Sequence, residues 1–499
     1  MIATLLQRAQ TLSAAILERP VQDPRWMQVR QFALTDLQRS LEFDADLPEA
    51  QLLIGRLQVM PLGDPNAAKR ALTKVVDSPL ATPEQMAQAL AIRGSLQREE
   101  EKQAADFDRA VELSPMSPNY YRVRAQYRYS KDKFEDALAD ADKALELAPD
   151  DPGTLELRGL ILLGLDRLDD ALASFNKAGE LAPEAVLPYQ HRGEVYRRQG
   201  DLKKSVEQLS KALELAPNDA GTLLLRATVY YQLNDSEHAL EDIDAVIARQ
   251  PQLLMAHLLK AEIYAATKRG DQAIEQLERL VPLAPDQVRL LDPLGRYYLV
   301  AGKPRKCIET FSKVLEIDPE SYVALRFRGD AYLNIGKHKE AVADFDRAVA
   351  LSEEDDGLLN NFAWVLATSP TDEVRDGKRS IDLAKKADEL TSYNVPHILS
   401  TLAAAYAETG DFDEAKKWSQ KAIEVCQSDI ETAKTDEERK RSEADLVNLK
   451  KELDNYEEGK PVRERQTQED APSQPDPQAS SSAFAPPSAV QAPARTLDF

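Results

Sequence analysis

Cysteine and long apolar runs are scarce in this chain of 499 residues. The two cysteines, Cys307 and Cys426, lie more than a hundred residues apart, which excludes a disulfide framework and a zinc cluster and fits a reducing compartment. No apolar run approaches the ~18 residues that a membrane-spanning helix needs. The first twenty residues also lack the basic leading segment of a signal peptide. We therefore expect a cytoplasmic protein with no membrane span.

Positive charge is in deficit. The chain holds 63 lysines and arginines against 85 aspartates and glutamates, so its formal net charge is −22 at pH 7. A field of this sign repels a phosphate backbone, and general nucleic-acid binding is disfavoured. Charges of both signs are scattered along the chain, which indicates solvated helix faces rather than one acidic docking surface.

Glycine, with 19 residues, and aromatic residues, at 6%, are also infrequent. A turn-rich β-sheet protein is therefore not expected. Much of the 43% hydrophobic share is alanine and leucine, which have high helix propensity and suit close packing between helices. The composition predicts an all-α protein with enough apolar surface to bury a core.

Motifs of catalysis are missing as well. The sequence has no phosphate-binding loop, no dinucleotide fingerprint, no nucleophile elbow and no HExxH pair. The histidines are not spaced from one another or from a cysteine as metal ligands usually are: His191, His238, His257, His338 and His397. We expect no enzymatic activity, no cofactor and no metal.

What the sequence does contain is a row of prolines with a period of 34. Its members are Pro115, Pro149, Pro183, Pro217, Pro251, Pro285 and Pro319. Such a period, with helical patterning between the marks, is typical of stacked helix-turn-helix repeats. A glycine stands 24 residues before the proline in several units, as in Gly159, Gly193 and Gly295.

The residue types within one period have a physical reading. Gly193 and its counterparts lack a side chain, so the two helices of a pair can approach closely. Gly200, Gly302 and Gly336 suit the positive-φ residue that ends the first helix of a pair. An arginine precedes the glycine position in five units, where we expect its methylenes to lie on the core and its head to reach water or an acid: Arg124, Arg158, Arg192, Arg226 and Arg328.

These units resemble tetratricopeptide repeats (TPR). Gly329, Tyr332, Ala341, Phe345 and Ala348 follow the preferred residue types of that family closely. The resemblance implies a right-handed α-solenoid of stacked antiparallel helix pairs. We predict a helical cap over 1–47, an array of about eleven repeats over 48–427 with an irregular tenth, a capping helix over 428–460, and a disordered Pro/Ser/Ala/Gln-rich tail over 461–499.

Several positions break the pattern. Gly94 is displaced by three residues, so we expect a shorter or distorted turn near 97–102. Glu353 stands where a proline is expected, and a polar insertion around Pro370 and Gly377 enlarges the turn of the tenth unit. In the N-terminal cap, a helix near 26–43 carries Phe32, Leu37 and Leu41 on one stripe.

The resemblance also implies a binding surface, because the first helices of TPR pairs line a concave groove that holds peptides. The register predicts these groove residues: Tyr231, Met255, Leu258, Arg289, Arg296, Arg326, Asn360 and Trp364. The three arginines could hold an acidic peptide, or Asp292 and Asp330 could neutralise them. Any of these side chains could instead pack against a neighbouring helix.

We therefore expect a non-catalytic scaffold that binds a protein or peptide partner in this groove. A second hypothesis is that the chain is the repeat portion of a larger enzyme or of a secretion or assembly polypeptide, with an upstream domain or signal before Met1. The last repeats resemble those of bacterial TPR proteins, in which such arrays often follow an enzymatic or PDZ-like domain. Within 428–458, a seam of Leu446, Leu449, Leu453 and Tyr456 could cap the last repeat or support self-association.

Overall fold

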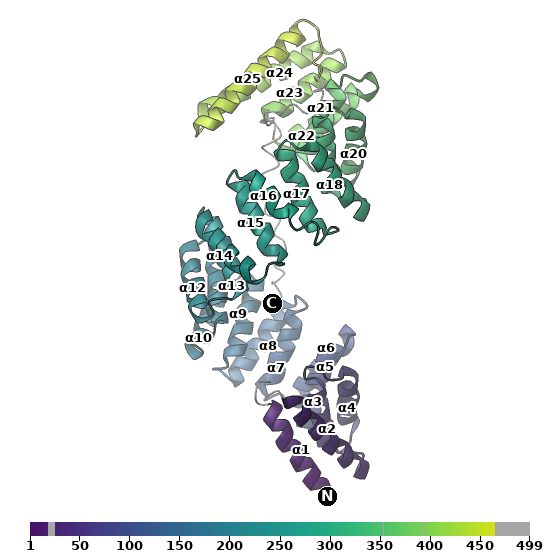
Figure 1. Ribbon diagram of the computed structural model, residues 1–499, viewed down its shortest axis with the longest axis vertical. Helices are drawn as coiled ribbons and strands as arrows, with labels where there is room; N and C mark the ends of the chain where they lie inside the picture. The colour runs from purple at the N-terminus through teal and green to yellow at the C-terminus, as the bar shows by residue number, and fades with distance from the viewer. Residues whose placement is uncertain (18–24, 353, 393, 465–499) are drawn as a thin grey trace. The chain divides into compact units, whose positions relative to one another are not determined.

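A computed structural model describes residues 1–17, 25–352, 354–392 and 394–464. Throughout these residues the secondary structure is helical, with 25 α-helices, one short 3₁₀ helix and no strand. The predictions that concern Glu353 and the tail beyond residue 464 lie outside the described residues. The described residues form two compact units, 1–235 and 236–464, and each is described by itself (Figure 1).

The first unit holds thirteen helices in its described part. They are α1 (Ile2–Leu17), α2 (Trp26–Phe43), α3 (Pro48–Gln58), α4 (Pro65–Asp77), α5 (Pro83–Leu96), α6 (Glu100–Leu113), α7 (Pro118–Tyr129), α8 (Phe134–Leu147), α9 (Pro152–Gly164), α10 (Leu168–Leu181), α11 (Leu187–Arg198), α12 (Leu202–Leu215) and α13 (Ala220–Gln232).

The second unit continues the same alternation of helices. It contains α14 (Ser236–Arg249), α15 (Leu254–Ala266), α16 (Gly270–Glu278), α17 (Val288–Val300), α18 (Pro304–Ile317), α19 (Tyr322–Asn334), α20 (His338–Leu351), α21 (Asp356–Thr368), η1 (Asp372–Val374), α22 (Gly377–Leu390), α23 (Pro396–Glu408), α24 (Phe412–Thr432) and α25 (Asp436–Glu457). From α3 to α24, we call the odd-numbered helices A helices and the even-numbered ones B helices.

Within a pair, the glycine of the A helix allows the close approach that its position predicts. A Cβ placed on Gly159 would lie 2.4 Å from the Phe175 ring, and one on Gly329 would lie 2.4 Å from the Phe345 ring. Both aromatic side chains are fully buried. The core between two helices of a pair is thus built from a missing side chain on one helix and a large one on the other.

The seven turns from A to B helices between α7 and α20 each contain one left-handed residue, and these residues again recur every 34 positions. The predicted Gly200, Gly302 and Gly336 all have positive φ, which confirms their role. The same conformation occurs in residues with side chains: Asp132, Asp166, Asn234 and Lys268. A backbone N–H just beyond the turn reaches back to the end of the helix, as from Asp201 to the Tyr196 carbonyl at 2.9 Å, so the helix C-terminus is capped in each case.

Three of the arginines before the glycine position connect three helices, as a structural role requires: Arg124, Arg158 and Arg328. Arg328 donates to Asp344 on its own B helix, α20, and to Ser312 on the preceding B helix, α18. Arg124 binds Asp140 and Asp108 in the same way. The arginine therefore joins successive repeats, because its partners lie sixteen residues before and after it.

Gly94 shows why the second repeat departs from the register. The turn between α5 and α6 is not shortened, since it leaves three residues between the helices, as the turn from α9 to α10 does. Instead α5 ends two residues after Gly94, whereas α9 ends five residues after Gly159. Gly94 consequently faces Phe107, thirteen residues on, and its turn has no positive-φ residue.

Two further helix boundaries differ from expectation for local reasons. The helix α16 ends at Glu278, four residues before Pro282, because a proline cannot donate to that carbonyl and its ring clashes with it. The charged segment 428–460 is not one helix, since α24 runs on to Thr432 and a new helix, α25, follows. Thr435 and Glu438 form a capping box that starts α25.

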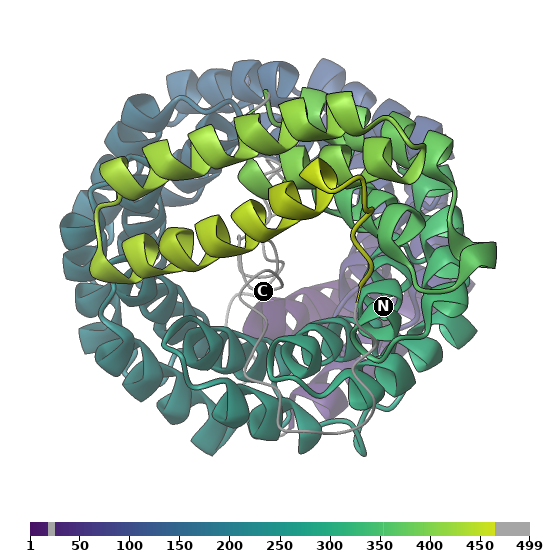
Figure 2. The same cartoon turned by 90° about the horizontal axis from the view of Figure 1, so that it is seen from above.

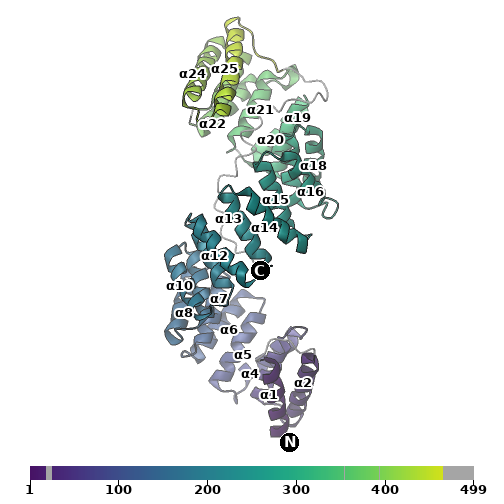
Figure 3. The ribbon, with the colours of Figure 1, turned by 60° about the vertical axis from the view of Figure 1, so that its left-hand side comes forward.

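The two ends of the array carry helix pairs. At the start, α1 and α2 lie side by side (Figure 3) and share a core with α3 around Ala9, Leu34 and Leu37. Phe32 does not belong to that stripe, because its side chain is 63% exposed.

At the other end, α24 and α25 form an antiparallel pair (Figure 2). The predicted seam packs inside the chain. Leu449 is buried against Ile423 and Cys426 of α24, with Leu446 and Leu453 alongside, and Tyr456 is buried against Ala403 of α23. The same leucines thus supply a cap on the last repeat.

The enlarged turn of the tenth repeat and the chain that follows α25 both bind the same residue of α23. Arg375, next to η1, and Arg463 both make ion pairs with Glu408 of α23, at 2.8 and 2.6 Å. The Glu464 N–H donates to the Thr368 carbonyl at the end of α21, at 2.9 Å. Residues 461–464, predicted to begin a disordered tail, are instead held against α21 and α23.

The A-helix face as candidate functional site

Eight side chains on four successive A helices of the second unit make up the candidate surface, which we call the A-helix face. They form two rows with a spacing of 34, and members of the two rows lie four residues apart, which places them on one side of each helix. The rows are Leu258, Asp292, Arg326 and Asn360, and Glu262, Arg296, Asp330 and Trp364. They come from α15, α17, α19 and α21. These four helices carry seven of the eight predicted groove residues, all except Tyr231.

The position of the first row has a structural role in several repeats. In the first unit, Arg122 pairs with Asp151 at 4.0 Å, and Gln190 donates to Asp219 at 2.9 Å. Both aspartates are the N-cap residues of the next A helix. A donor at this position therefore binds the following repeat through its helix N-terminus.

Arg326 follows this rule. Its guanidinium forms an ion pair with Asp355, the N-cap of α21, and the Tyr322 hydroxyl donates to the same carboxylate at 2.5 Å. Arg326 and Asp355 are both largely buried, with side chains 15% and 17% exposed. Of the predicted arginines, this one is thus engaged within the fold, although its Nε has no hydrogen-bond partner.

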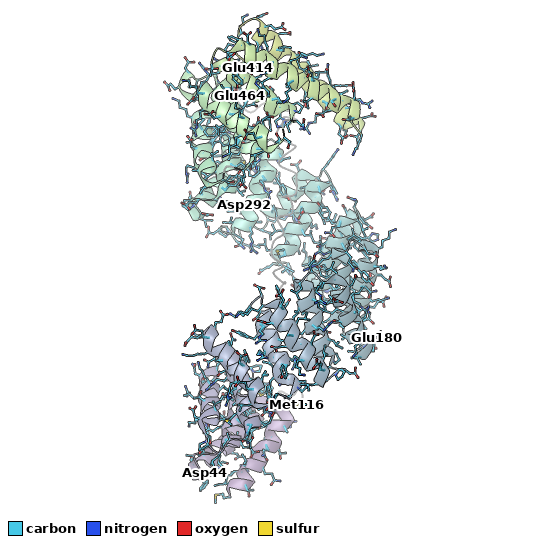
Figure 4. The ribbon with its side chains drawn as sticks, turned by 180° about the vertical axis from the view of Figure 1, so that it is seen from behind. Asp44, Met116, Glu180, Asp292, Glu414 and Glu464 are labelled. Atoms are coloured by element: carbon cyan, nitrogen blue, oxygen red, sulfur yellow. The ribbon has the colours of Figure 1, made fainter. Side chains whose placement is uncertain are left out.

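Asp292 does not follow this rule. It places an acid where Arg122, Gln190 and Arg326 place a donor, and the N-cap that follows it is Ser321, whose hydroxyl already accepts from the Ala324 N–H. The Oδ1 atom of Asp292 is buried without a hydrogen-bond partner. Burial raises the pKa of Asp292; Arg296 opposes this shift and Asp318 adds to it. Asp292 is labelled in Figure 4.

Asp330 lies one repeat further on, in the second row. Its Oδ1 accepts a hydrogen bond from Asn361 Nδ2 at 2.9 Å. Burial raises the pKa of Asp330 to about 6, against the opposing influence of Arg326 and the Asn361 hydrogen bond. The Asp330 carboxylate is therefore only partly compensated by the chain itself.

Asn360 adds an unmet acceptor to the first row. Its side chain is only 8% exposed. Its Nδ2 donates to Asn361 Oδ1 at 3.4 Å, and its Oδ1 has no hydrogen-bond partner. The three residues Asn360, Asn361 and Asp330 thus form a polar chain from α21 to α19 that ends in an open acceptor.

Arg296 lies in the field of two acids. The pKa of Glu262 is raised by desolvation, with Arg296 opposing the shift, and Arg296 opposes the shift at Asp292 too. The Arg296 Nε is buried without an acceptor. The expected neutralisation of the arginines by Asp292 and Asp330 is therefore only partial at Arg296, and at Arg326 it comes from Asp355, which sequence reasoning missed.

The other predicted residues differ in exposure. Met255 is 51% exposed and Leu258 is half-buried. Arg289 is exposed at the start of α17. Trp364 packs against Ala367 and Ala404 and remains partly exposed. Tyr231 lies in the first unit, on α13, and is not placed relative to the rest.

Asp355 is the residue of this surface that sequence reasoning did not find. Asp355 was recognisable as a helix start, since an aspartate directly before an apolar-periodic run is a common N-cap.

Among the described residues, no group of three or more His, Cys, Asp or Glu could hold a metal ion. None of the described helices is long and apolar enough to cross a membrane.

Family models for tetratricopeptide repeats match the chain in several places. One matches residues 101–153, 122–186, 224–288 and 293–356, a second matches 193–234, and a third matches 397–428. A search of curated protein sequences gave no match.

Solved structures of repeat proteins resemble the chain at low identity. A tetratricopeptide repeat protein from Parabacteroides merdae is 20% identical over 51% of this chain and 98% of its own, with a TM-score of 0.40. PilF of Pseudomonas aeruginosa is 21% identical over 42% of this chain and 96% of its own, with a TM-score of 0.36. The Cut9–Hcn1 structure is 14% identical over 90% of this chain and 91% of its own, with a TM-score of 0.40.

Proposed function

Because the chain belongs to the tetratricopeptide repeat family, we propose that it is a non-catalytic scaffold that binds a protein or peptide partner on the A-helix face of its second unit. Proteins built from these repeats generally act through protein–protein contacts. The proposal assigns the contact to α15, α17, α19 and α21.

The observation that carries the proposal is the pattern of unmet hydrogen bonds on this face. Asp292 Oδ1 and Asn360 Oδ1 are buried acceptors without donors, and Arg296 Nε is a buried donor without an acceptor. A buried polar group left unpaired costs about 1–3 kcal/mol. An extended peptide offers N–H and C=O groups in alternation, so its main chain can satisfy both kinds.

Apolar side chains on the same helices supply the other requirement of a peptide site. Met255 is half-exposed at the start of α15, and Leu258 and Trp364 are partly exposed on α15 and α21. Apolar contacts of this kind provide affinity, while a few placed polar groups fix the register of the bound peptide.

Affinity purification of the full chain tests this proposal. We expect Leu258→Ala combined with Trp364→Ala to lose the partner that the wild-type chain retains. The matched control is Ile317→Ala with Leu351→Ala, which removes two apolar side chains from the ends of α18 and α20, where they are 46% and 44% exposed. Equal retention of every partner by all three proteins, each with a wild-type circular dichroism spectrum, would contradict the proposal.

A further inference from the structure

We infer that the partner presents a basic side chain, an arginine or a lysine, which pairs with Asp292 on the A-helix face. This inference rests on the proposed function and names the chemistry of the segment bound there. The surface is selective for a positive charge, in contrast to the acidic peptide that three predicted arginines suggested.

The register gives the first reason. At the position of Asp292, the next repeat has a donor that binds the N-cap aspartate of the following helix, as Arg326 binds Asp355. In α17 the acid replaces the donor, and the following N-cap is Ser321 instead of an aspartate. The repeat therefore contains a carboxylate with one buried oxygen, Oδ1, for which the described residues supply no donor.

The charges around it give the second reason. Arg326 lies on the same helix as Asp330, α19, but its guanidinium already pairs with Asp355. The Tyr322 hydroxyl donates to that same Asp355 carboxylate. Arg296 is the remaining guanidinium among the eight residues of the face, and it interacts electrostatically with both Glu262 and Asp292. Negative charge thus exceeds positive charge here, and complementarity of charge selects a cationic group.

An independent observation also calls for a donor-rich ligand. Asn360 is more than nine-tenths buried, and its Oδ1 has no partner. It lies in the same row as Asp292, two A helices further along. A guanidinium offers five N–H donors and no acceptor, and a lysine offers three donors. Trp364, four residues after Asn360, adds an aromatic ring that can accept a cation.

The probe is a positional-scanning library of acetylated nonapeptides, in which the central residue is fixed in turn and the flanks are mixed. Fluorescent full-length chain reports binding. We expect pools with central arginine or lysine to bind about tenfold more strongly than pools with glutamine, a difference typical of one charged hydrogen bond. Asp292→Asn combined with Asp330→Asn should abolish this preference. The charge-matched control, Glu309→Gln with Glu316→Gln on α18, should keep it.

The outcomes separate this inference from the proposed function. Pools that bind, and lose binding in the Leu258→Ala and Trp364→Ala variant, but show no preference for basic residues would overturn the inference and leave the function standing. A preference for acidic residues would do the same. Absence of binding by every pool, or binding that the Leu258→Ala and Trp364→Ala variant leaves unchanged, would overturn both.

Discussion

The guanidinium of Arg328 makes two parallel hydrogen bonds to the carboxylate of Asp344, at 2.7 and 2.8 Å, and a third to Ser312 of the preceding repeat at 3.1 Å. Asp344 is 4% exposed. This arrangement makes one side chain responsible for both the pairing of helices in a repeat and the stacking of repeats.

We predict that Arg328→Leu, which places an apolar residue at this position, destabilises the array by about 3 kcal/mol, because it leaves the Asp344 carboxylate buried and unpaired. Adding Asp344→Leu should recover most of the loss. Hydrogen exchange of the α18–α20 amides in the full chain would measure both effects. An additive loss in the double variant would show that the two side chains do not act as a pair.

The close contact between helices of a pair gives a second prediction. Gly329→Ala should destabilise the protein by about 1–3 kcal/mol, since the new methyl group would meet the Phe345 ring and force it to move. Gly270→Ala is the matched control. It lies at the start of α16 with nothing within 4 Å of its Cβ position, so we expect no loss. Thermal unfolding of the two variants distinguishes steric conflict from any general effect of alanine.

The left-handed residue in the turn after α15 gives a third. Lys268 has φ of 60°, a conformation that costs a residue with a side chain about 1–2 kcal/mol and glycine almost nothing. Lys268→Gly should raise the midpoint of thermal unfolding, and Gly302→Ala, at the same position of the next repeat, should lower it. The ion pair between Lys268 and Glu437 is exposed, so its loss in Lys268→Gly should change the stability little. A lower midpoint for Lys268→Gly would contradict this account of the turn.

Asp388 provides a prediction about pH. Both of its carboxylate oxygens are buried without a hydrogen-bond partner, and burial raises its pKa, with Lys421 opposing the shift and Glu389 adding to it. A raised pKa in the folded state means that the protonated acid favours folding. Its contribution is therefore largest below the unfolded pKa and is lost as pH rises through the folded pKa.

Asp388→Asn should accordingly stabilise the protein at pH 7.5 and have a smaller effect near pH 4. Denaturant unfolding at the two pH values, compared with Asp382→Asn on the exposed side of the same helix, would measure the difference. A stabilisation that is equal at both pH values would show that ionisation of Asp388 is not its cause.

Much of the fold could be read from the sequence, since its geometry depends on residue type. Gly193 predicts a close approach of two helices, and Gly200 predicts a left-handed residue in the turn, because only glycine allows either without an energetic cost. Lys268 adopts the same turn and gives no such sign, since the helices on both sides impose a conformation that its side chain disfavours. The start of α25 was readable from Thr435 and Glu438, but the charged composition suggested one continuous helix.

The candidate surface was harder to predict. The register correctly assigns Asp292 and Arg326 to equivalent positions, but only the structure shows that this position reaches the N-cap of the next A helix. That contact joins residues 29 apart across a turn and a whole B helix, so local pattern cannot reveal it. Consequently Arg326 looked available from sequence and is engaged, while Asp292 looked like a neutralising partner and has an unpaired oxygen.

Photo-crosslinking to the partner tests the central claim most directly. A benzoylphenylalanine placed at Met255 or at Arg289, two exposed positions at the starts of α15 and α17, should crosslink to the same partner in cells. The same group at Glu316, exposed on the B helix α18, should give no such product. Crosslinking from residue 316 in place of residues 255 and 289 would contradict the assignment of binding to the A-helix face.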